Sequence, residues 1–588
     1  FFLDLNKRDI DSNSVINALV LDPNLNPVIF SEDVTVPTNR FSISPRFDYQ
    51  INEKHTLVAR YSYTRSTQSN QGIGNLTLAS RAFASKNRDH DFQITETMII
   101  NPTTINETRF RYEYSKNSRF GDNSIPALNV GSAFTGGGSQ VGVSFDRSHQ
   151  WELQNYTTTS LGKNSQHAIK FGVRVRGNDT TDRSENNFGG SFTFTNLDSY
   201  RGAILGTAFP TQFSVTVGNP QQSVSQTDFG IFITDDWRIN PGLTITGGLR
   251  YENQTNTSDN FNLAPRLSVA WAPGAGGATP AKTVLRAGFG MYYDRFSQNL
   301  TLQARRFNGV EQLSLIVNST DPDPVRRAAA IALLQQPTFS LNGVTNAPTA
   351  DQILAVLPQG NTIRTISPDV QSPYTYQTSF SVERQLPRRS TLSVSYEGSR
   401  TVHVLRSRNI NAPICPLQVN CASAPRPDPT AGNIFQNEST GVSNQNQIVV
   451  NFRSQFNSRV SLITSTYRLG YANNNSDGSG SFPADSFDLS DEYGRAAFDV
   501  RHYFVLGGSL NLPWRVSLSP FIIANSGRPF NITRGIDFNG DSLFTERPTF
   551  GELASRCSAL GVTKAFCDVG DQDPNLIIPR NFGKSPAS

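Results

Sequence analysis

Apolar and polar residues alternate strictly along several stretches of this chain. Between residues 41 and 52 every odd position is apolar and every even position is polar, and the same pattern returns at 55–64, 105–114 and 167–176. Successive side chains of a β-strand point to opposite faces, whereas a helix repeats every 3.6 residues. The pattern therefore predicts β-strands with one apolar face and one polar face.

The polar faces of these predicted strands carry many charged residues. Arginine, lysine and glutamate alternate with apolar residues such as Phe110 and Tyr112 in one strand and Phe171 and Val173 in another. In a membrane barrel the apolar face meets lipid and the polar face meets the lumen. The candidates for lumen-facing residues are Arg60, Arg109, Arg111, Glu113, Lys170, Arg174, Arg176 and Arg250.

The connections between the predicted strands alternate between short and long. Short turns are predicted at Asn101 and Pro102, at Asn240 to Gly242, at Pro387 and at Pro513, and also around 162–165. The long, Asn-, Gly- and Ser-rich connections cover roughly 65–89, 116–147, 178–224, 294–372, 401–444, 471–497 and 526–588. A soluble sandwich also alternates, but it has no reason to sort its loops by length.

This arrangement predicts an all-β fold, a large antiparallel up-and-down transmembrane β-barrel with long extracellular loops. The repeats run roughly ten to thirteen residues, close to the length that a tilted membrane strand needs. We expect roughly 16 strands within 41–525 and one more at 1–8, hence roughly 17 in all. The long loop 294–372 is expected to hold short helices at 325–336 and 351–357, and 526–588 is expected to be a long C-terminal loop.

Composition agrees with an exported β-protein. Charged residues make up 17% of the chain and aromatic residues 10%, and the formal net charge is only +4. The basic residues are scattered, so we expect no nucleic-acid partner. No stretch approaches the ~20 consecutive apolar residues of a membrane helix.

The four cysteines form two local pairs in loop-like sequence. Cys415 and Cys421 are close together, and so are Cys557 and Cys567. Such pairs are typical of disulfides in exported proteins, and four free thiols are the alternative. Zinc is disfavoured, because the pairs are far apart and lack CxxC spacing.

One acidic cluster resembles the start of a calcium loop. Asp537, Asn539 and Asp541 place oxygen ligands at alternate residues, but the sixth position is not glycine and the twelfth is Pro548. The alternative is an Asp/Asn-Gly turn in a solvated loop. No HExxH, GxSxG or P-loop motif occurs, so we expect neither an enzyme nor a bound cofactor.

Several stretches, in order, resemble the Oar-like branch of TonB-dependent outer-membrane transporters. They include FITDDWRINPGLTITGGLRYE from Phe232, VLRAGFGMYYDRF from Val284, FDVRHYFVLGGSLNLPW from Phe498 and NSGRPFNITRGIDFNGD from Asn525. The resemblance covers most of the chain. It implies a 22-strand type of barrel with an N-terminal plug, in the outer membrane of a Gram-negative bacterium. Energised import of a siderophore, oligosaccharide, peptide or similar solute through contact with the TonB complex is also implied.

The chain departs from the family pattern at both ends. It shows no plug or TonB box, and it stops at Ser588 without an aromatic-ended last strand. We therefore expect a partial barrel with an open seam beside residues 514–524. The alternatives to transport are a surface or adhesion protein, whose barrel anchors binding loops, and a passive porin.

Overall fold

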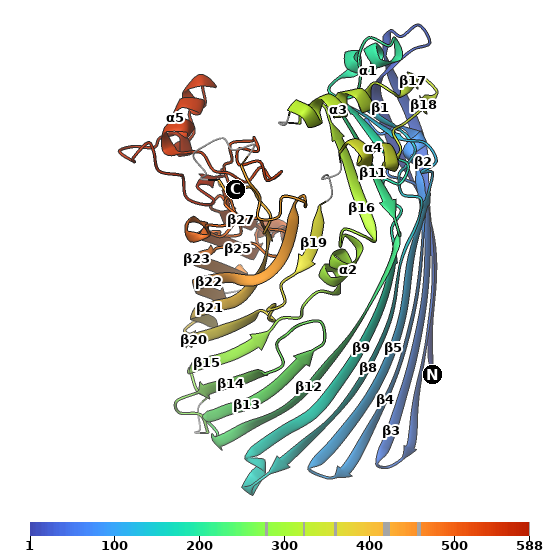
Figure 1. Cartoon of the computed structure of the whole chain (residues 1–588). Helices are drawn as coiled ribbons and strands as arrows, with labels where there is room; N and C mark the ends of the chain where they lie inside the picture. Colours follow the sequence, from blue (N-terminus) through green and yellow to red (C-terminus); the bar gives the residue numbers. More distant parts are fainter. Residues whose placement is uncertain (277–279, 322–323, 358–361, 416–423, 456–459, 587–588) are drawn as a thin grey trace.

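The computed structural model describes residues 1–588 except 277–279, 322–323, 358–361, 416–423, 456–459 and 587–588. Its main element is one strongly curved sheet of 20 strands, with loops and short helices gathered at one end (Figure 1). In the part of the chain that is described, no helix combines the length and the apolar character needed to cross a bilayer.

The large sheet is an antiparallel meander in which each strand pairs with its neighbours along the chain. Of its 20 strands, β19 and β24 are short additions, and β26 and β27 are two pieces of one interrupted strand, which leaves 17. The predicted fold class is confirmed. The meander consists of β1 (Phe2–Leu21), β2 (Pro27–Asn52), β3 (His55–Gln71), β4 (Phe83–Asn101), β5 (Thr104–Gly121), β8 (Val143–Leu161), β9 (His167–Arg183), β12 (Gln221–Asn240), β13 (Leu243–Gln254), β14 (Asn262–Trp271), β15 (Thr283–Tyr293), β20 (Tyr374–Leu386), β21 (Ser390–Asn409), β22 (Ile434–Ser454), β23 (Val460–Asn474), β25 (His502–Asn511), β26 (Ser517–Leu518) and β27 (Phe521–Asn525).

Asparagine side chains shape the short turns at one end of the sheet. The Asn101 Oδ1 atom accepts the Thr103 amide at 2.9 Å, and the Asn240 Oδ1 atom accepts the Gly242 amide at 2.9 Å. Asn52 does the same for Lys54. An Asx turn of this kind reverses the chain within two residues, and it sets the register of each hairpin.

The strands are longer than the sequence pattern predicts. β2 has 26 residues and spans about 85 Å, far more than the about 9–11 residues that a tilted membrane strand needs. The expected loops 65–89, 116–147, 178–224 and 401–444 are therefore partly strand. The missed segments, such as 64–71 and 115–119, carry polar side chains on both faces, because outside the membrane neither face meets lipid. The additional strand expected at 1–8 likewise extends to Leu21.

Rings on neighbouring strands mark where this polar extension begins. One row of rings crosses β3, β4, β5 and β8 and consists of Tyr63, His90, Tyr114 and His149. The centroids of successive rings in this row lie 4.8 to 5.7 Å apart. Tyr61 bonds His90 at 2.8 Å between the hydroxyl and Nδ1. Rings with a polar edge are enriched at membrane interfaces, so this row fits an aromatic girdle.

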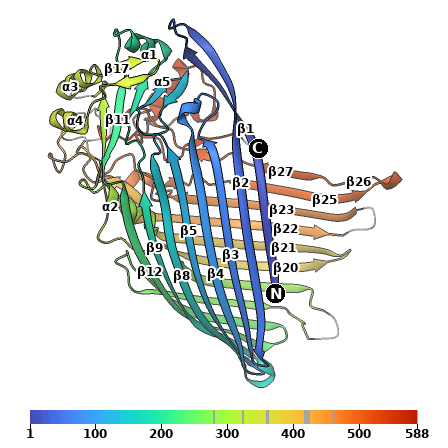
Figure 2. The ribbon, with the colours of Figure 1, turned by 90° about the vertical axis from the view of Figure 1, so that its right-hand side faces the viewer.

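Three long loops combine into a separate subdomain above the barrel wall (Figure 2). Its five-stranded sheet has the order β16-β11-β10-β6-β7, and β6 and β10 pair in parallel. The sequence prediction treated these residues as loops, although two of the helices, α3 and α4, lie where they were expected. The elements of the subdomain are β6 (Ala127–Val130), β7 (Phe134–Gly137), β10 (Ser191–Phe194), α1 (Leu197–Ile204), β11 (Gln212–Gly218), β16 (Gln312–Asn318), α3 (Pro324–Leu334), β17 (Thr338–Ser340), β18 (Gly343–Thr345) and α4 (Ala350–Val356). The same loops also contain α2 (Gln298–Arg306) and β19 (Ile363–Ile366), which lie against the barrel wall, and the 3-10 turns η1 (Ala79–Arg81) and η2 (Lys163–Ser165) lie in other connections.

The subdomain has a hydrophobic core of its own. Phe192 is fully buried and lies 4.4 Å from Phe213 and 5.1 Å from Phe339, measured between ring centroids. The tip of β1 contributes Ile16, which is also fully buried. Each buried Phe contributes several kcal/mol on the scale of truncation experiments, roughly 3–5. This core holds three loops and the β1–β2 hairpin together as one body.

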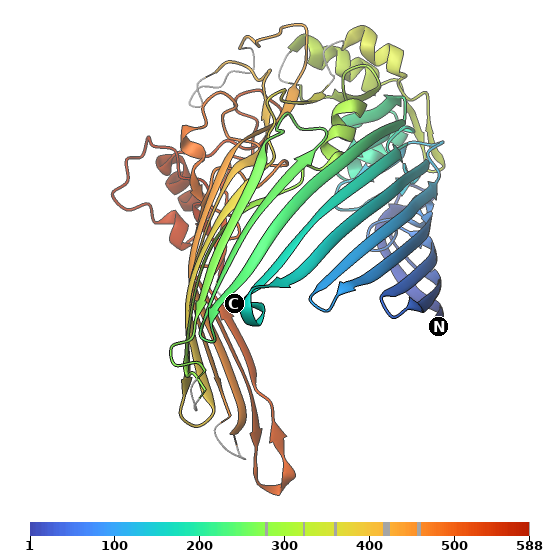
Figure 3. The ribbon, with the colours of Figure 1, turned by 90° about the horizontal axis from the view of Figure 1, so that it is seen from below.

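The sheet does not close on itself. β1 pairs with β2 and β27 pairs with β25, and no ladder joins β1 to β27 within the described residues. Figure 3 shows the two ends of the sheet apart. The predicted seam beside 514–524 is thus present, next to β27.

The C-terminal segment after β27 is irregular but packed. It contains β28 (Pro529–Phe530), α5 (Phe550–Ala559), η5 (Ala565–Cys567) and β29 (Gly583–Lys584). It lies against the loop after β23, which contains η3 (Ser490–Glu492) and β24 (Gly494–Arg495): the Arg547 guanidinium donates to the Glu492 carboxylate at 2.8 Å. The turn before β26 is η4 (Pro513–Arg515).

If the apolar face of the sheet meets lipid, an arginine introduced on that face should destabilise the protein more than an arginine introduced on the polar face. Phe380 is 49% exposed on the apolar face, halfway along β20, and Ala287 and Tyr396 lie on either side of it. We expect Phe380→Arg to lower the free energy of unfolding in lipid vesicles by roughly 2–4 kcal/mol, because a guanidinium there would meet hydrocarbon. Urea titration of the vesicle-bound protein measures this change.

Ser379→Arg is the matched control. Ser379 is the preceding residue on the opposite face, and Glu397 lies directly across from it. The introduced charge would meet water and a carboxylate there, so we expect little loss of stability. An equal loss for both variants would contradict the assignment of faces.

Candidate functional site: the concave polar face

The charged side chains of the strands lie on the concave face of the sheet. In β9, Asn178 and Thr180 have the same parity as Arg174 and Arg176, and both bond to the Gln298 side chain of α2. Helix α2 contacts both β12 and the short strand β19, and β19 pairs with β22. Five strands separate β12 from β22 in the sheet, so α2 and β19, which contact each other, bridge these two strands across the concave side (Figure 1). The alternate apolar side chains therefore face outward.

All eight predicted lumen residues share this concave face, and the structure brings several of them together. Directly opposed residues form a row across five neighbouring strands, β3 to β9, and on to β12. Opposed residues of paired strands lie on the same face within contact distance. The row reads Arg60, Gln93, Arg111, Glu152, Arg176 and Asp228.

Acidic residues on the same strand or on an adjacent strand pair with these arginines. Arg111 bonds Asp91 at 2.8 Å and Glu113 at 2.9 Å. Arg174 contacts Glu152 at 3.3 Å, and Arg109 contacts Glu107 at 2.9 Å. Within the strand row the charges thus largely cancel locally. The acidic partners Asp91, Glu152, Asp228 and Glu252 were missed from the sequence, although each alternates with apolar residues in its own strand.

The remaining predicted residues also have neighbours on this face. Arg250 bonds Glu252 at 2.5 Å between Nε and the carboxylate. The Lys170 ammonium lies 4.1 Å from the centre of the Tyr156 ring, a cation–π distance. Arg60 is exposed. The face is therefore charged yet nearly balanced, which suits contact with a polar occupant or with water.

Asp228 connects the wall to the residues at the start of helix α2. Its carboxylate bonds Arg176 at 2.6 Å and contacts Arg295 at 3.5 Å, and only 12% of its side chain is exposed. Arg295 lies just before α2, and Arg306 at the end of α2 pairs with Asp182 of β9. Ion pairs with both ends of α2 therefore hold this helix against the wall.

A pocket of about 590 Å³ opens on the other half of the wall. Gly288 and Gly290 line it in β15, where the absence of side chains leaves room. The Arg266 guanidinium lies 4.3 Å from the centre of the Tyr292 ring beside it. The remaining lining is mostly amide, hydroxyl and carboxylate, including Gln377, Ser379, Glu397, Ser399, Gln445 and Gln447. Such a surface can form many hydrogen bonds with a polar solute.

Two cysteine pairs and one acidic cluster in the loops were also singled out from the sequence. Cys557 and Cys567 form a disulfide with a Cα–Cα distance of 5.9 Å. The other predicted pair includes Cys421, which lies outside the described residues. Asp537, Asn539 and Asp541 lie in one loop, and the structure adds Glu546, which no fixed motif spacing would have indicated.

The family comparison agrees with this architecture. A model of the outer membrane beta barrel domain matches residues 10–262 and 253–568, which together make up most of the chain. The chain belongs to this family. No curated protein matches the sequence significantly. The apolar outside and charged inside of this outer-membrane β-barrel domain are what a bilayer location requires, so the protein resides in the Gram-negative outer membrane.

Solved structures share the fold at low sequence identity. The outer membrane transporter YddB from Escherichia coli superposes with a TM-score of 0.60 and 11% identity, over 92% of this β-barrel chain. A ferric enterobactin receptor mutant (PfeA) from Pseudomonas aeruginosa gives a TM-score of 0.49 and 12% identity over 86% of the chain and 59% of its own. The chain spans only 62% of the length of the Escherichia coli transporter. At these identities the likeness concerns the fold alone.

Removing the charge of Asp228 tests the anchoring of α2. We expect Asp228→Asn to destabilise the β-barrel by roughly 1–3 kcal/mol, because Arg176 and Arg295 lose their common carboxylate. Amide hydrogen exchange in α2 should also accelerate. Asp236→Asn is the control, since Asp236 lies exposed on the same face, where its carboxylate accepts a hydrogen bond from the Thr246 hydroxyl at 2.6 Å. Equal exchange in both variants would contradict the anchoring.

Proposed function

We propose that this β-barrel domain is the wall of a TonB-dependent transporter that imports a scarce or bulky polar solute. The solute class includes siderophores, oligosaccharides and peptides. The proposal rests on the resemblance of the sequence to the Oar-like branch and on the fold shared with an outer membrane transporter. It assigns the protein a transport role and no enzymatic reaction.

The charged concave face is the observation that supports transport most directly. A barrel wall of this many strands curves around a wide lumen, and a wide lumen needs either water or a protein to fill it. Arginines paired with acidic groups, such as Arg111 with Asp91, present both signs of charge at fixed positions. A plug domain with complementary polar groups can bind such a wall and can be released from it at small cost, because partly hydrated ion pairs contribute only roughly 0–1 kcal/mol each.

The same geometry suggests how the solute would be held. The pocket lined by Gln377, Glu397 and Gln447 lies on the wall between β13 and β22. Its amides and carboxylate offer donors and acceptors to hydroxyl-rich or amide-rich molecules. In this proposal the TonB complex acts through the plug, and it provides the energy that moves the plug away from the wall.

The loop subdomain favours a second candidate, a surface-binding protein. Its packed core, with Phe192 and Ile16 fully buried, makes a rigid body outside the membrane rather than a set of separate loops. A rigid outer body can bind a macromolecular partner while the barrel anchors it. A passive porin is the third candidate, and it would need no energy source.

Solute uptake by the intact protein in cells with and without TonB separates these functions. We expect accumulation of a labelled ferric siderophore, oligosaccharide or peptide that disappears when the tonB gene is deleted. Replacing Glu397 and Gln447 by alanine should raise the solute concentration needed for half-maximal uptake, because the pocket loses hydrogen-bonding groups. Ser14→Ala serves as a control, since its hydroxyl bonds the Ile73 carbonyl far from the pocket.

Each alternative gives a different pattern in the same cells. Uptake that persists without TonB would identify a porin. Surface binding of a macromolecule without any uptake would identify the adhesive function. Either result would reject energised import.

A further inference from the structure

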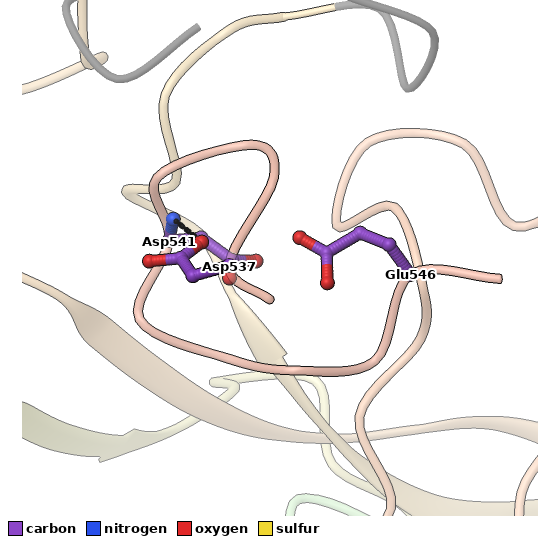
Figure 4. Close-up of side chains that lie close together, drawn as sticks. All are labelled: Asp537, Asp541 and Glu546. Carbon is purple, nitrogen blue, oxygen red and sulfur yellow. Dashed lines mark hydrogen bonds between the residues drawn. The ribbon is translucent and has the colours of Figure 1, made fainter. Parts of the chain in front are cut away.

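A buried group of oxygen atoms lies in the C-terminal segment, outside the barrel wall. One carboxylate oxygen each from Asp537, Asp541 and Glu546 lies within 4.8 Å of the others. Figure 4 shows Glu546 approaching from the opposite side of the loop and pointing toward the two aspartates. Asn539 lies between the aspartates in sequence and is only 4% exposed. Three carboxylates therefore converge, and the Asn539 side chain lies beside them, with its amide nitrogen donating to the Asp541 carboxylate at 3.3 Å.

The Glu546 carboxylate is only half satisfied. Its Oε1 atom accepts the backbone amides of Phe538 at 3.1 Å and of Asn539 at 3.2 Å. Its Oε2 atom is buried and has no hydrogen-bond partner among the described residues, although Glu546 is only 1% exposed. A buried, unpaired carboxylate oxygen is costly, so this atom indicates a missing positively charged partner.

The neighbouring arginines do not supply that partner. Arg426 donates to the Gly540 carbonyl at 2.9 Å and to the Asn433 side chain at 2.9 Å. Arg534 pairs with Glu552 at 2.9 Å. Within the described residues no lysine or arginine forms an ion pair with the three clustered carboxylates.

Mutual repulsion and burial change the acidity of the cluster. Burial, together with the charges of Glu546 and Asp537, raises the pKa of Asp541 to about 7. Burial likewise raises the pKa of Glu546 above its ordinary value. A bound cation would offset the repulsion between these carboxylates.

We propose that Asp537, Asn539, Asp541 and Glu546 bind one Ca²⁺ ion. Calcium–oxygen distances of about 2.3–2.6 Å allow ligand oxygens on opposite sides of one ion to lie roughly 5 Å apart, which accommodates the observed cluster. An all-oxygen set disfavours zinc and copper, which prefer nitrogen or sulfur ligands. Mg²⁺ retains several waters and demands a near-ideal octahedron, which this irregular, buried set does not provide.

The ion would hold the C-terminal segment against the loops of the barrel. The Asp541 carbonyl accepts a hydrogen bond from Asn409 at the end of β21. A few residues later the Thr545 hydroxyl donates to the Pro483 carbonyl at 2.9 Å, and Arg547 pairs with Glu492. By neutralising the buried carboxylates that lie between these contacts, the ion would stabilise the packing of the C-terminal segment against the barrel loops. This inference does not depend on transport.

Calorimetric titration of the full chain in detergent with CaCl2, after removal of metal with EDTA, tests the proposal. We expect one Ca²⁺ ion per chain, and slower proteolysis within 526–588 when calcium is present. Asp541→Asn combined with Glu546→Gln should weaken calcium binding at least tenfold, about 1.4 kcal/mol, since two ligand charges are removed. Asp568→Asn with Asp571→Asn, two exposed residues of the same segment, should bind as the unaltered chain does.

The melting temperature distinguishes loss of the ion from loss of the fold. In EDTA the Asp541→Asn, Glu546→Gln chain should melt at the same temperature as the unaltered chain or higher, because its buried amides need no counter-charge. Added calcium should raise the melting temperature of the unaltered chain only. The absence of calcium binding by the folded, unaltered chain would overturn the proposal. Unchanged calcium binding by the doubly substituted chain would also overturn it.

Discussion

Every backbone N–H and C=O group that crosses the hydrocarbon of a bilayer needs a partner within the protein, because lipid offers none. Between its two edge strands, β1 and β27, the antiparallel meander of this chain meets that requirement strand by strand, with the asparagine turns setting the register at one end. Once the ladders are formed, the period of two places one side chain in lipid and the next in the lumen. The sorting of Phe380 from Ser379, or of Tyr112 from Arg111, follows from this constraint alone.

The same constraint shapes the inside of the wall. Charged groups cannot face lipid, so they gather on the concave face, where opposed strands bring arginines beside carboxylates. The ion pairs on this face also position other parts of the chain: Asp228 bonds Arg176 of the wall and contacts Arg295 just before α2. The inner face thus provides both a polar surface for an occupant and an attachment for helix α2.

Beyond the membrane the constraint is relaxed, and ordinary soluble packing takes over. The strands continue past the aromatic row of Tyr63, His90, Tyr114 and His149 with polar residues on both faces. Above them, three loops and the tip of β1 bury a common core around Phe192 and Ile16. The C-terminal segment packs in a similar way, through a disulfide, a small core and the buried carboxylates near Asp541. The molecule therefore combines a wall organised by lipid with outer bodies organised by water.

Sequence by itself determined the features that depend on near neighbours in the chain. Alternation predicted the strands and their faces, Asn–Pro turns predicted the hairpins, and all eight lumen residues lie on the predicted face, because a strand's geometry is set by its own residues. Only the tertiary structure decided the contacts between distant segments. The partners of Arg111 and Arg176 come from other strands, the loop sheet joins strands from three loops, and Glu546 meets Asp541 through a loop of no fixed spacing. The extensions of the strands beyond the membrane were not predicted, because water lies on both of their faces and they lack the apolar–polar alternation by which a membrane strand is recognised.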